Sequence, residues 1–569
     1  MGDAPGRHYD EVDAPFSADP GAAMSTFSDE SARSFSAGAD PEPEGADDIR
    51  LTFDRDVLRQ FQDAVDAADY DTATAVVRDH WFDVVIGIRQ GFAQVAERIP
   101  ASELHTRPLL MMMLGIAYNL QPHRRMKGLR YFVGAARAAR QGVDRMGPVD
   151  RALILVSESA AYRLIGRPRL GGAAARKAVA ALDGLPLDQR ASVQALSRIY
   201  AHVGTTQYYA GEVELALETF EKGLAESPPI GYSSGFANVA MAAGIHALRG
   251  DIHEAMAYIE LAQDEQWTAM QRSWYPGTFY RIAEAVVALE RFDAPTAREQ
   301  LAAMTHDRRT IEHWRAIAVT EAFVELVDGR PSAGLAGMDA FAALRGAEGR
   351  GAAARRELAP SRALLHIALG DLTTATAVLR QLESGSVHRH VGQARVELAL
   401  GRTGAALQQL RRVAGEPMDS RVRAEALSLE SAALLRFAGG PRRRTAVEEL
   451  GELLRASGQR LAVALVPVDD FPGLVDALAG AGFGDVLERV PARSLLLPRP
   501  EGEPLSPREL AVLEVYLRTS RVPEVAQELG VSVNTVKSQI RSIYRKLDVS
   551  NRDEAIAVAL DRHLVRPQD

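Results

Sequence analysis

One pattern recurs six times along the middle of this chain of 569 residues. In each copy a helix-forming stretch ends at a turn residue, a small residue follows five positions later, and a bulky apolar residue stands four positions beyond that. The turn residues are Gly211, Gly250, Phe292, Gly329, Gly370 and Gly401. The small residues are Ala216, Ala255, Ala297, Gly334, Ala375 and Ala406. The bulky residues are Phe220, Ile259, Leu301, Met338, Leu379 and Leu410.

This pattern predicts a series of helical hairpins. Glycine ends a helix in a left-handed conformation that a side chain would strain. The small residue lets two antiparallel helices approach closely, and the apolar residue four positions later lies on the same helix face. Between about Leu51 and Arg455, apolar residues recur at steps of three and four, so we expect helix after helix.

One of these units resembles the tetratricopeptide family of helical hairpin repeats. The residues that match, at the family's own spacing, are Gly204, Ala216, Phe220, Gly223 and Pro228. The family's first-helix pattern also occurs at Met111, Leu114, Gly115 and Tyr118, and the other units match less closely. The resemblance implies a tetratricopeptide-like α-solenoid over residues 49–455, whose concave surface binds an unknown small molecule or protein. The alternative is a scaffold that holds other domains apart, and no single binding residue is predicted.

Residues 1–48 are predicted to form a disordered acidic leader. Between Met1 and Arg50 there are twelve Asp or Glu against three Lys or Arg, which accounts for the whole net charge of −9. The segment is rich in Pro, Gly, Ser and Ala, and it has too few apolar residues to offset the entropy of ordering. It is either a solubilising leader or an interaction tail.

Composition limits the location of the chain. No apolar run approaches the length of a membrane span, and the N-terminus lacks the layout of a secretory signal. The absence of cysteine excludes disulfides, thiolate metal sites and thiol nucleophiles. We therefore expect a cytoplasmic protein without membrane contact.

Residues 456–503 interrupt the helical pattern. The apolar runs Arg460–Val468 and Arg493–Leu497 are predicted either to form short strands around a helix near 474–479 or to form a last pair of helices. Residues 498–504, with the sequence PRPEGEP, read as a linker. We expect a small mixed segment that ends in this linker.

The last domain, residues 504–569, opens with strong signals for the start of a helix. Ser506 is predicted to cap it, Pro507 to take its first position, and Glu509 to complete a capping box. The first three predicted helices span 507–517, 522–529 and 533–547, with Gly530 in the turn before the third. Asn551 is expected to cap a fourth helix.

The third of these helices carries two stripes. The stripe expected to be buried consists of Val536, Ile540, Ile543 and Leu547. A neighbouring basic stripe consists of Lys537, Arg541 and Arg545. A short helix, a glycine turn and a helix with one basic face are what binding in the DNA major groove requires. From Glu501 onward there are ten Lys or Arg against eleven Asp or Glu, so net charge alone does not decide for DNA.

The whole domain resembles the LuxR-type helix-turn-helix family. The shared positions are 505–509, Ala526, Leu529, Val531, Ser532, Thr535, Val536, Lys537, Ile540, Ile543, Lys546, Leu547, Val549 and Arg552. Two departures are present. Gln539 stands where the family usually has His, and Val522 with Pro523 replaces a usual polar pair, so Pro523 is expected to alter phosphate contacts.

This resemblance implies roles for nine residues. Those expected to contact base edges are Lys537, Ser538 and Arg541. Those expected to hold phosphates are Asn534, Thr535 and Arg545. Those expected to form a dimer surface on the fourth helix are Ala555, Val558 and Ala559. The implied partners are double-stranded DNA, a second copy of the chain on a palindromic site and, as a candidate, RNA polymerase.

The residues give little support to catalysis. A P-loop would need a Gly-Lys pair, which the sequence lacks. Gly231–Gly235 reads G-x-S-x-G, but it lies between helical hairpins rather than on a strand-to-helix turn. The His residues show no H-E-x-x-H spacing. We expect no enzyme, no catalytic residue, no cofactor and no metal.

Together these features predict an all-α protein in which a tetratricopeptide-like solenoid precedes a four-helix LuxR-type domain. The predicted function is that of a DNA-binding transcription regulator, controlled by a ligand or protein bound to the helical repeats. Activation is favoured over repression only by the habit of the family that it resembles. The alternative is a protein-interaction scaffold whose C-terminal module no longer binds DNA.

Overall fold

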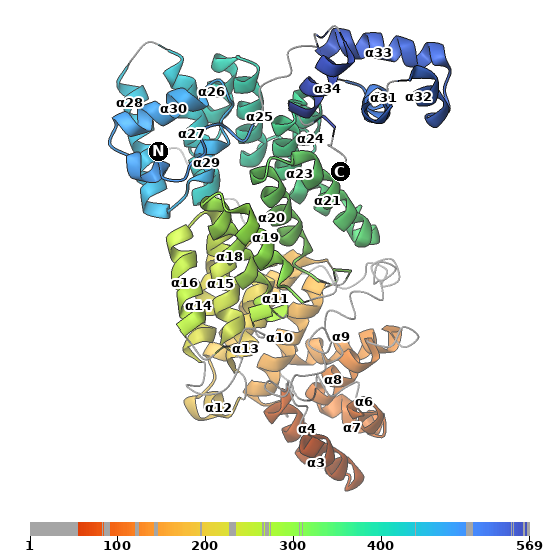
Figure 1. Ribbon diagram of the computed structural model, residues 1–569. Coiled ribbons are helices and arrows are strands. Elements are labelled where there is room, and N and C mark those ends of the chain that lie inside the picture. Colours follow the sequence, from red (N-terminus) through yellow and green to blue (C-terminus); the bar gives the residue numbers. More distant parts are fainter. Residues whose placement is uncertain are drawn as a thin grey trace, which may run out of the picture. The chain divides into compact units, whose positions relative to one another are not determined.

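The computed structural model describes residues 55–565 except 82–83, 85–90, 120–124, 142–145, 165, 194–195, 227–234, 265–266, 268–271, 274, 306–307, 310, 438–439, 497–504, 520, 548, 550 and 562–563. The predicted leader, the linker at 498–504 and most of the G-x-S-x-G motif lie outside the described residues. Within them all regular secondary structure is helical, as predicted, and the chain divides into two compact units, Met1–Ser227 and Pro228–Asp569 (Figure 1). None of the described helices is long and apolar enough to cross a membrane.

The first unit is a run of helical hairpins. Its helices are α3 (Arg55–Asp66), α4 (Tyr70–Asp79), α6 (Phe92–Ala96), α7 (Ala101–Thr106), α8 (Pro108–Asn119), α9 (Arg125–Gln141), α10 (Pro148–Leu164), α11 (Pro168–Asp183), α12 (Leu187–Ser192), α13 (Leu196–Tyr209) and α14 (Val213–Ala225). Helix α3 packs on α4, α8 on α9, α10 on α11 and α13 on α14. The apolar faces of most of these helices, from α3 to α13, share one hydrophobic cluster, in which Phe61, Met112 and Tyr200 are fully buried.

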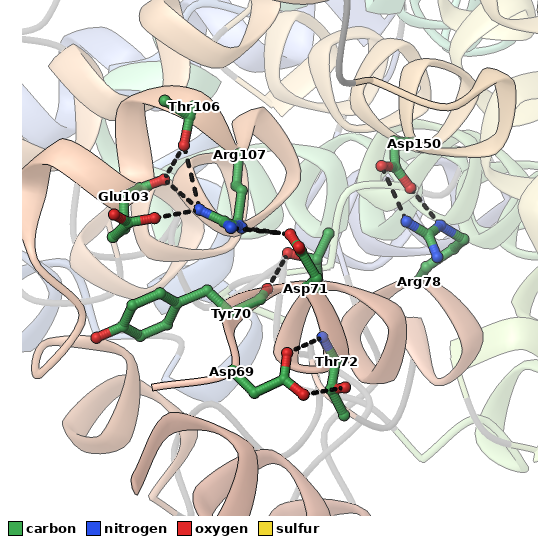
Figure 2. A network of polar contacts seen from close by, with 10 residues as sticks. Asp69, Tyr70, Asp71, Thr72, Arg78, Glu103, Thr106, Arg107 and Asp150 are labelled. Atoms are coloured by element: carbon green, nitrogen blue, oxygen red, sulfur yellow. Dashed lines mark hydrogen bonds and ion pairs between the residues drawn. The ribbon is translucent and has the colours of Figure 1, made fainter. Parts of the chain in front are cut away.

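Ion pairs fix α4 within this unit, as Figure 2 shows. Arg107, between α7 and α8, donates from Nε to Asp71 of α4 at 2.9 Å and from Nη1 to Glu103. Arg78, near the other end of α4, makes a two-pronged contact with Asp150 of α10, at 2.5 and 3.2 Å. Because the Asp150 side chain is almost fully buried, this pair ties α4 to α10 more firmly than an exposed pair would.

The second unit continues the hairpins and ends with the C-terminal domain. Its helices up to residue 487 are α15 (Phe236–Arg249), α16 (Ile252–Asp264), η3 (Tyr275–Gly277), α18 (Thr278–Glu290), α19 (Ala294–Ala302), α20 (Trp314–Val327), α21 (Pro331–Leu344), α22 (Gly346–Gly349), α23 (Ala352–Ala368), α24 (Leu372–Leu379), α25 (Val387–Ala399), α26 (Thr403–Arg411), α27 (Ser420–Leu435), α28 (Pro441–Ser457), α29 (Leu461–Ala464), α30 (Phe471–Gly480) and η4 (Gly484–Leu487). The first helix of each hairpin packs against the first helix of the next, from α15 through α18, α20, α23 and α25 to α27. This stacking makes the repeats a tetratricopeptide-like α-solenoid.

The predicted repeat pattern is confirmed in the backbone. All six turn residues have positive φ, between 57° and 88°, and Phe292 adopts this conformation despite its side chain. All six small residues are buried, as are four of the six bulky ones, whereas Ile259 and Leu301 are half-buried. A Cβ atom added at Gly204 would lie 2.6 Å from the Phe220 ring, so the small residue is needed for α13 to approach α14.

The described residues of 456–496 contain the short helices 461–464, 471–480 and 484–487 and no strand, so the strand alternative is wrong, and residues 493–496 are not a helix either. The apolar run from Leu461 to Val466 is buried along its whole length, and a short buried helix gives the same unbroken apolar pattern as a buried strand. Residues of α29, α30 and η4 pack in one hydrophobic cluster with α25–α28. This segment is therefore the end of the solenoid, and the expected boundary at residue 455 falls inside α28.

Within the second unit, the last helices of the hairpin series pack against the first ones. Helix α27 packs against α15, and α28 packs against α16. Arg421 of α27 donates to the Glu290 carboxylate at the end of α18, at 2.9 Å. The other oxygen of Glu290 accepts the backbone N–H groups of Arg460 and Leu461, each at 2.7 Å. The Glu290 side chain is 1% exposed, so a buried carboxylate joins segments that are 131 to 171 residues apart.

We predict opposite effects on stability for two glycine substitutions, one in the turn before α21 and one within α21. Gly329→Ala should lower the stability of the second unit by about 1–2 kcal/mol, because Gly329 has a φ of +73° although its Cβ would meet no atom. Gly337→Ala, in the exposed middle of α21 and equally free of neighbours, should raise stability by about 0.5–1 kcal/mol. Urea unfolding of the full chain, followed by circular dichroism, measures both. Equal effects would mean that left-handed geometry at Gly329 is not needed.

Candidate nucleic-acid interface

The C-terminal domain consists of α31 (Pro507–Arg518), α32 (Val522–Glu528), α33 (Val533–Leu547) and α34 (Arg552–Asp561) (Figure 1). The bounds of the first three differ from the predicted ones by at most one residue. The predicted buried stripe of α33 is confirmed and forms the centre of a separate hydrophobic cluster. Gly530 has a φ of +63° in the turn before α33, as its predicted role requires.

The predicted capping box is present at the start of α31. The Ser506 hydroxyl accepts the N–H of Glu509 at 3.3 Å, and the Glu509 carboxylate accepts the N–H of Ser506 at 2.6 Å. The same carboxylate oxygen pairs with Nζ of Lys546 at 2.9 Å, and these side chains are only 7% and 10% exposed. Glu509 therefore caps α31 and fixes it to the end of α33. The ion pair had no signal in the sequence, because 37 residues separate its partners.

The partners of Glu509 determine its protonation. Burial by itself would raise the pKa of this carboxyl, but hydrogen bonds from Lys546, Ser542 and Ser506 favour the charged form and lower the pKa to about 2. An unfolded glutamate titrates near pH 4.3, so the charged Glu509 stabilises the domain fully above about pH 4.3. This contribution is lost as the pH falls from about 4.3 towards about 2.

Arg552 at the start of α34 closes the other end of α31. Its guanidinium donates to the carbonyl of Tyr516 at 3.0 and 2.8 Å and to the carbonyl of Leu517 at 3.0 Å. A cation at the C-terminal end of a helix satisfies carbonyls that have no partner within the helix. Sequence reasoning included Arg552 only as a matching position of the family and did not predict this role.

The exposed face of α33 carries the residues expected to contact DNA. Those that are exposed are Asn534, Thr535, Lys537, Ser538, Arg541 and Arg545. Among the residues that the structure describes, Lys537 and Arg541 have neither a hydrogen-bond partner nor an ion-pair partner. Other cations of the domain are paired: Arg518 with Glu528, Arg521 with Glu524 and Lys546 with Glu509. The domain is close to neutral overall, but Glu509, Glu524 and Glu528 are paired with cations outside this face, which leaves Lys537 and Arg541 available for a nucleic acid.

The N-terminus of α33 is held by Ser532. Its hydroxyl accepts the N–H of Thr535 at 3.1 Å and lies 2.7 Å from the Thr535 hydroxyl. The Thr535 hydroxyl thus has a fixed position at the positive end of the helix dipole, where a phosphate is favoured. This geometry suits the role expected for Thr535 and, beside it, for the exposed Asn534.

The two departures from the family pattern leave the helices intact. Pro523 is the second residue of α32, a position whose backbone N–H has no partner within the helix, so proline costs no hydrogen bond there. Gln539 is half-buried on α33. Pro523 therefore preserves the fold of the helix, and its effect on phosphate contacts stays a prediction.

Two of the three residues expected on a dimer surface of α34 are buried inside the domain, and the dimer surface itself stays a prediction. Ala555 and Ala559 are 0% exposed and belong to the hydrophobic core of the domain. Val558 is half-buried and packs against the same core. The buried alanines are not available to a second copy, whereas the exposed Ala557 and half-buried Ile556 are.

Two short helices, a glycine turn and a longer helix with an exposed cationic face define a helix-turn-helix DNA-binding domain. Residues 503–559 match the family described as bacterial regulatory proteins, luxR family. These residues are therefore a LuxR-type helix-turn-helix domain, as the sequence predicted.

The domain is also similar to parts of known regulators. It is 43% identical over 56 residues to the HTH-type transcriptional regulator MalT of Vibrio campbellii, which covers 10% of this chain and 6% of MalT. It is 45% identical over 56 residues to the transcriptional regulatory protein DesR of Bacillus subtilis, which covers 10% of this chain and 28% of DesR. It is 34% identical over 94 residues to the probable transcriptional regulatory protein NarL of Mycobacterium tuberculosis, which covers 16% of this chain and 38% of NarL. This chain thus spans well under half of each of these relatives.

Solved helical-repeat structures resemble this chain only loosely. A tetratricopeptide repeat protein from Parabacteroides merdae is 14% identical with a TM-score of 0.29, covering 49% of this chain and 98% of that one. The APC/C hetero-tetramer Cut9–Hcn1 is 12% identical with a TM-score of 0.29, covering 77% of this chain and 96% of that one. The description of the repeats as tetratricopeptide-like rests on the hairpins of this chain.

We predict that Glu509→Gln destabilises the domain by about 1–3 kcal/mol at neutral pH, because the amide keeps the shape but leaves Lys546 without a charged partner. The difference from the wild type should shrink as the pH falls from about 4.3 to about 2, where the wild-type carboxyl also becomes uncharged. Urea unfolding of a fragment spanning residues 503–569, at several pH values, measures this.

Glu514→Gln is the matched control, since Glu514 is exposed on the same helix, and it should change stability by less than about 0.5 kcal/mol. A difference between wild type and Glu509→Gln that stays constant with pH would show that the charge of Glu509 is not what stabilises the domain.

Proposed function

We propose that this protein is a transcription regulator that reads the major groove of double-stranded DNA with α33. The observation that carries the proposal is the match of residues 503–559 to the luxR family, together with the exposed and unpaired Lys537 and Arg541 of α33. In this proposal a ligand or protein bound to the helical repeats controls DNA binding. We further propose that the protein binds a palindromic site as a homodimer. It would act on RNA polymerase, in the cytoplasm.

Two groups of side chains have different tasks in the proposed complex. Lys537, Ser538 and Arg541 contact base edges and therefore determine sequence preference. Asn534, Thr535 and Arg545, which lie towards the two ends of the helix, hold phosphates and therefore fix the position of α33.

A scaffold without DNA binding is the second candidate, and its two supports are weak. Pro523 occupies a position in α32 that needs no N–H donor. The near-neutral charge of the domain does not reach its reading face, because Glu528, Glu524 and Glu509 are paired with Arg518, Arg521 and Lys546 rather than with α33's exposed Lys537 and Arg541. Both features are therefore compatible with DNA binding.

The proposed function is tested by selecting binding sites from a random DNA pool with the full-length protein. We expect enrichment of a palindrome, which should be lost in a Lys537→Ala, Arg541→Ala double variant because both cations are removed from the reading face. A parallel selection uses the fragment of residues 503–569.

Each outcome of the selection has a definite meaning. A palindrome enriched by the fragment and not by the full chain would indicate that the repeats mask the domain until their partner binds. A single half-site without a palindrome would contradict the homodimer. No enrichment by either protein would overturn the regulator proposal in favour of a scaffold.

On the selected site, Arg541→Ala and Arg545→Ala should behave differently. Arg541→Ala should cost about 1–3 kcal/mol on the selected site and little on random DNA, because a base contact is lost. Arg545→Ala should weaken binding to both DNAs alike and lower the slope of log K against log salt by about one, because a phosphate contact is lost. Fluorescence anisotropy at several salt concentrations measures both, and equal losses on all sequences for both variants would contradict this division of roles.

A further inference from the structure

The hairpins of the second unit line a cavity of about 180 Å³ that is partly open to solvent. Its wall comes from the first helices of successive hairpins, α15, α18, α20, α23 and α25, and from α27, which packs against α15. This is the inner face that a helical solenoid offers to a ligand. Arg421 and Leu461, which both contact Glu290, are part of this wall, so the contact that joins the two ends also shapes the cavity.

Most of the cavity wall is apolar. Leu289 of α18, Leu364 of α23 and Val391 of α25 are buried side chains that line it, and Phe323 of α20 adds a ring. An apolar cavity of about 150 Å³ holds a molecule of the size of benzene. The cavity has room for a ring with a short substituent, and its wall favours an apolar body.

One side of the cavity carries a guanidinium group with an unused donor. Arg395 is 4% exposed, and it donates from Nε to the carbonyl of Leu465 at 3.0 Å and from Nη2 to Glu425 at 2.6 Å. Its Nη1 has no acceptor in the part of the chain that the structure describes. Because Arg395 lines the cavity, a ligand oxygen that accepts a hydrogen bond from Nη1 can take the place of water at this donor.

Both cations that line the cavity are already paired with carboxylates. Arg395 is paired with Glu425, and Arg421 is paired with Glu290. Asp419, which also lines the cavity, caps α27 by accepting the N–H of Val422. An anionic ligand would therefore bury a charge without a counter-charge, whereas an uncharged acceptor would not.

We propose that this cavity binds an uncharged, largely apolar small molecule about the size of a substituted ring, whose carbonyl or ether oxygen accepts a hydrogen bond from Nη1 of Arg395. The exposed His388, which belongs to the lining, marks the place where the cavity reaches solvent. This proposal names the class of ligand that would control DNA binding, and that control rests on the proposed function. Binding of the ligand itself involves no DNA and can be measured without it.

The test compares three probes of equal heavy-atom count with the full-length protein. Acetophenone has an apolar ring and a carbonyl, cumene replaces the carbonyl oxygen by a methyl group, and benzoate replaces the ketone by a carboxylate. Ligand-observed saturation-transfer NMR and competition between probes give their relative affinities. We expect acetophenone to bind about tenfold more tightly than either of the others, because only acetophenone supplies an uncharged acceptor.

Two matched substitutions locate the binding. Ala363→Phe should abolish acetophenone binding, because Ala363 of α23 lines the cavity with a buried methyl group and phenylalanine would fill the space. Ala377→Phe makes the same change on the exposed face of α24 and should leave binding intact. Circular dichroism verifies that each variant is folded, and the order of the three probes on the wild type tests the proposal without any variant.

Several results would overturn the proposal. They are the binding of none of the probes, equal binding of cumene and acetophenone, tightest binding of benzoate, or full binding by a folded Ala363→Phe protein. Repeating the measurement of DNA affinity with saturating acetophenone separates this proposal from the proposed function. Binding in the cavity without any change in DNA affinity would leave the cavity proposal standing and contradict control by a ligand at this site.

Discussion

The second compact unit depends on one buried carboxylate. Glu290 is the last residue of α18, and it holds Arg421 of α27 and the first backbone N–H groups of α29. A buried carboxylate is stable only when its oxygens are fully hydrogen-bonded, and here both oxygens have partners. Because these partners come from the last helices of the hairpin series, the hairpins cannot separate there without leaving the charge unpaired. Two of these partners, Arg421 and Leu461, also line the apolar cavity.

A second carboxylate has a comparable place in the C-terminal domain. Glu509 caps α31 and holds Lys546 at the end of α33, while Arg552 satisfies the carbonyls at the other end of α31. These contacts set the orientation of α33 and use charges that would otherwise compete with its exposed face. A domain with a near-neutral sum of charges can therefore present Lys537 and Arg541 to DNA.

The spacing of the solenoid helices is set by glycine and alanine rather than by large side chains. A Cβ added at Gly244 would lie 2.5 Å from the Phe279 ring, and one at Gly392 would lie 2.6 Å from Leu379. In each case the small residue is on one hairpin element and the large side chain fills the space above it, as Phe220 does over Gly204. This close packing leaves little freedom for the helices that line the cavity, which suits a preformed ligand site.

The sequence alone determined the local structure. The six turns with their small residues, the capping box of Ser506 and Glu509, and the apolar stripe of α33 all follow from interactions between residues a few positions apart. Such patterns can be read in order along the chain. The residues that match the LuxR-type family were recognised in the same way. The strand alternative for residues 461–466 failed because an unbroken apolar run does not distinguish a buried helix from a buried strand.

Only the tertiary structure decided which residues far apart in the sequence come into contact. The closure through Glu290, the cavity beside Arg395 and the Lys546–Glu509 pair join residues separated by 37 to 171 positions, and no local pattern encodes such pairings. The burial of Ala555 and Ala559 belongs to the same class, because a small apolar face on one helix fits its own core as well as a second copy. Local patterns specify which face of a helix is apolar, and packing alone specifies what covers it.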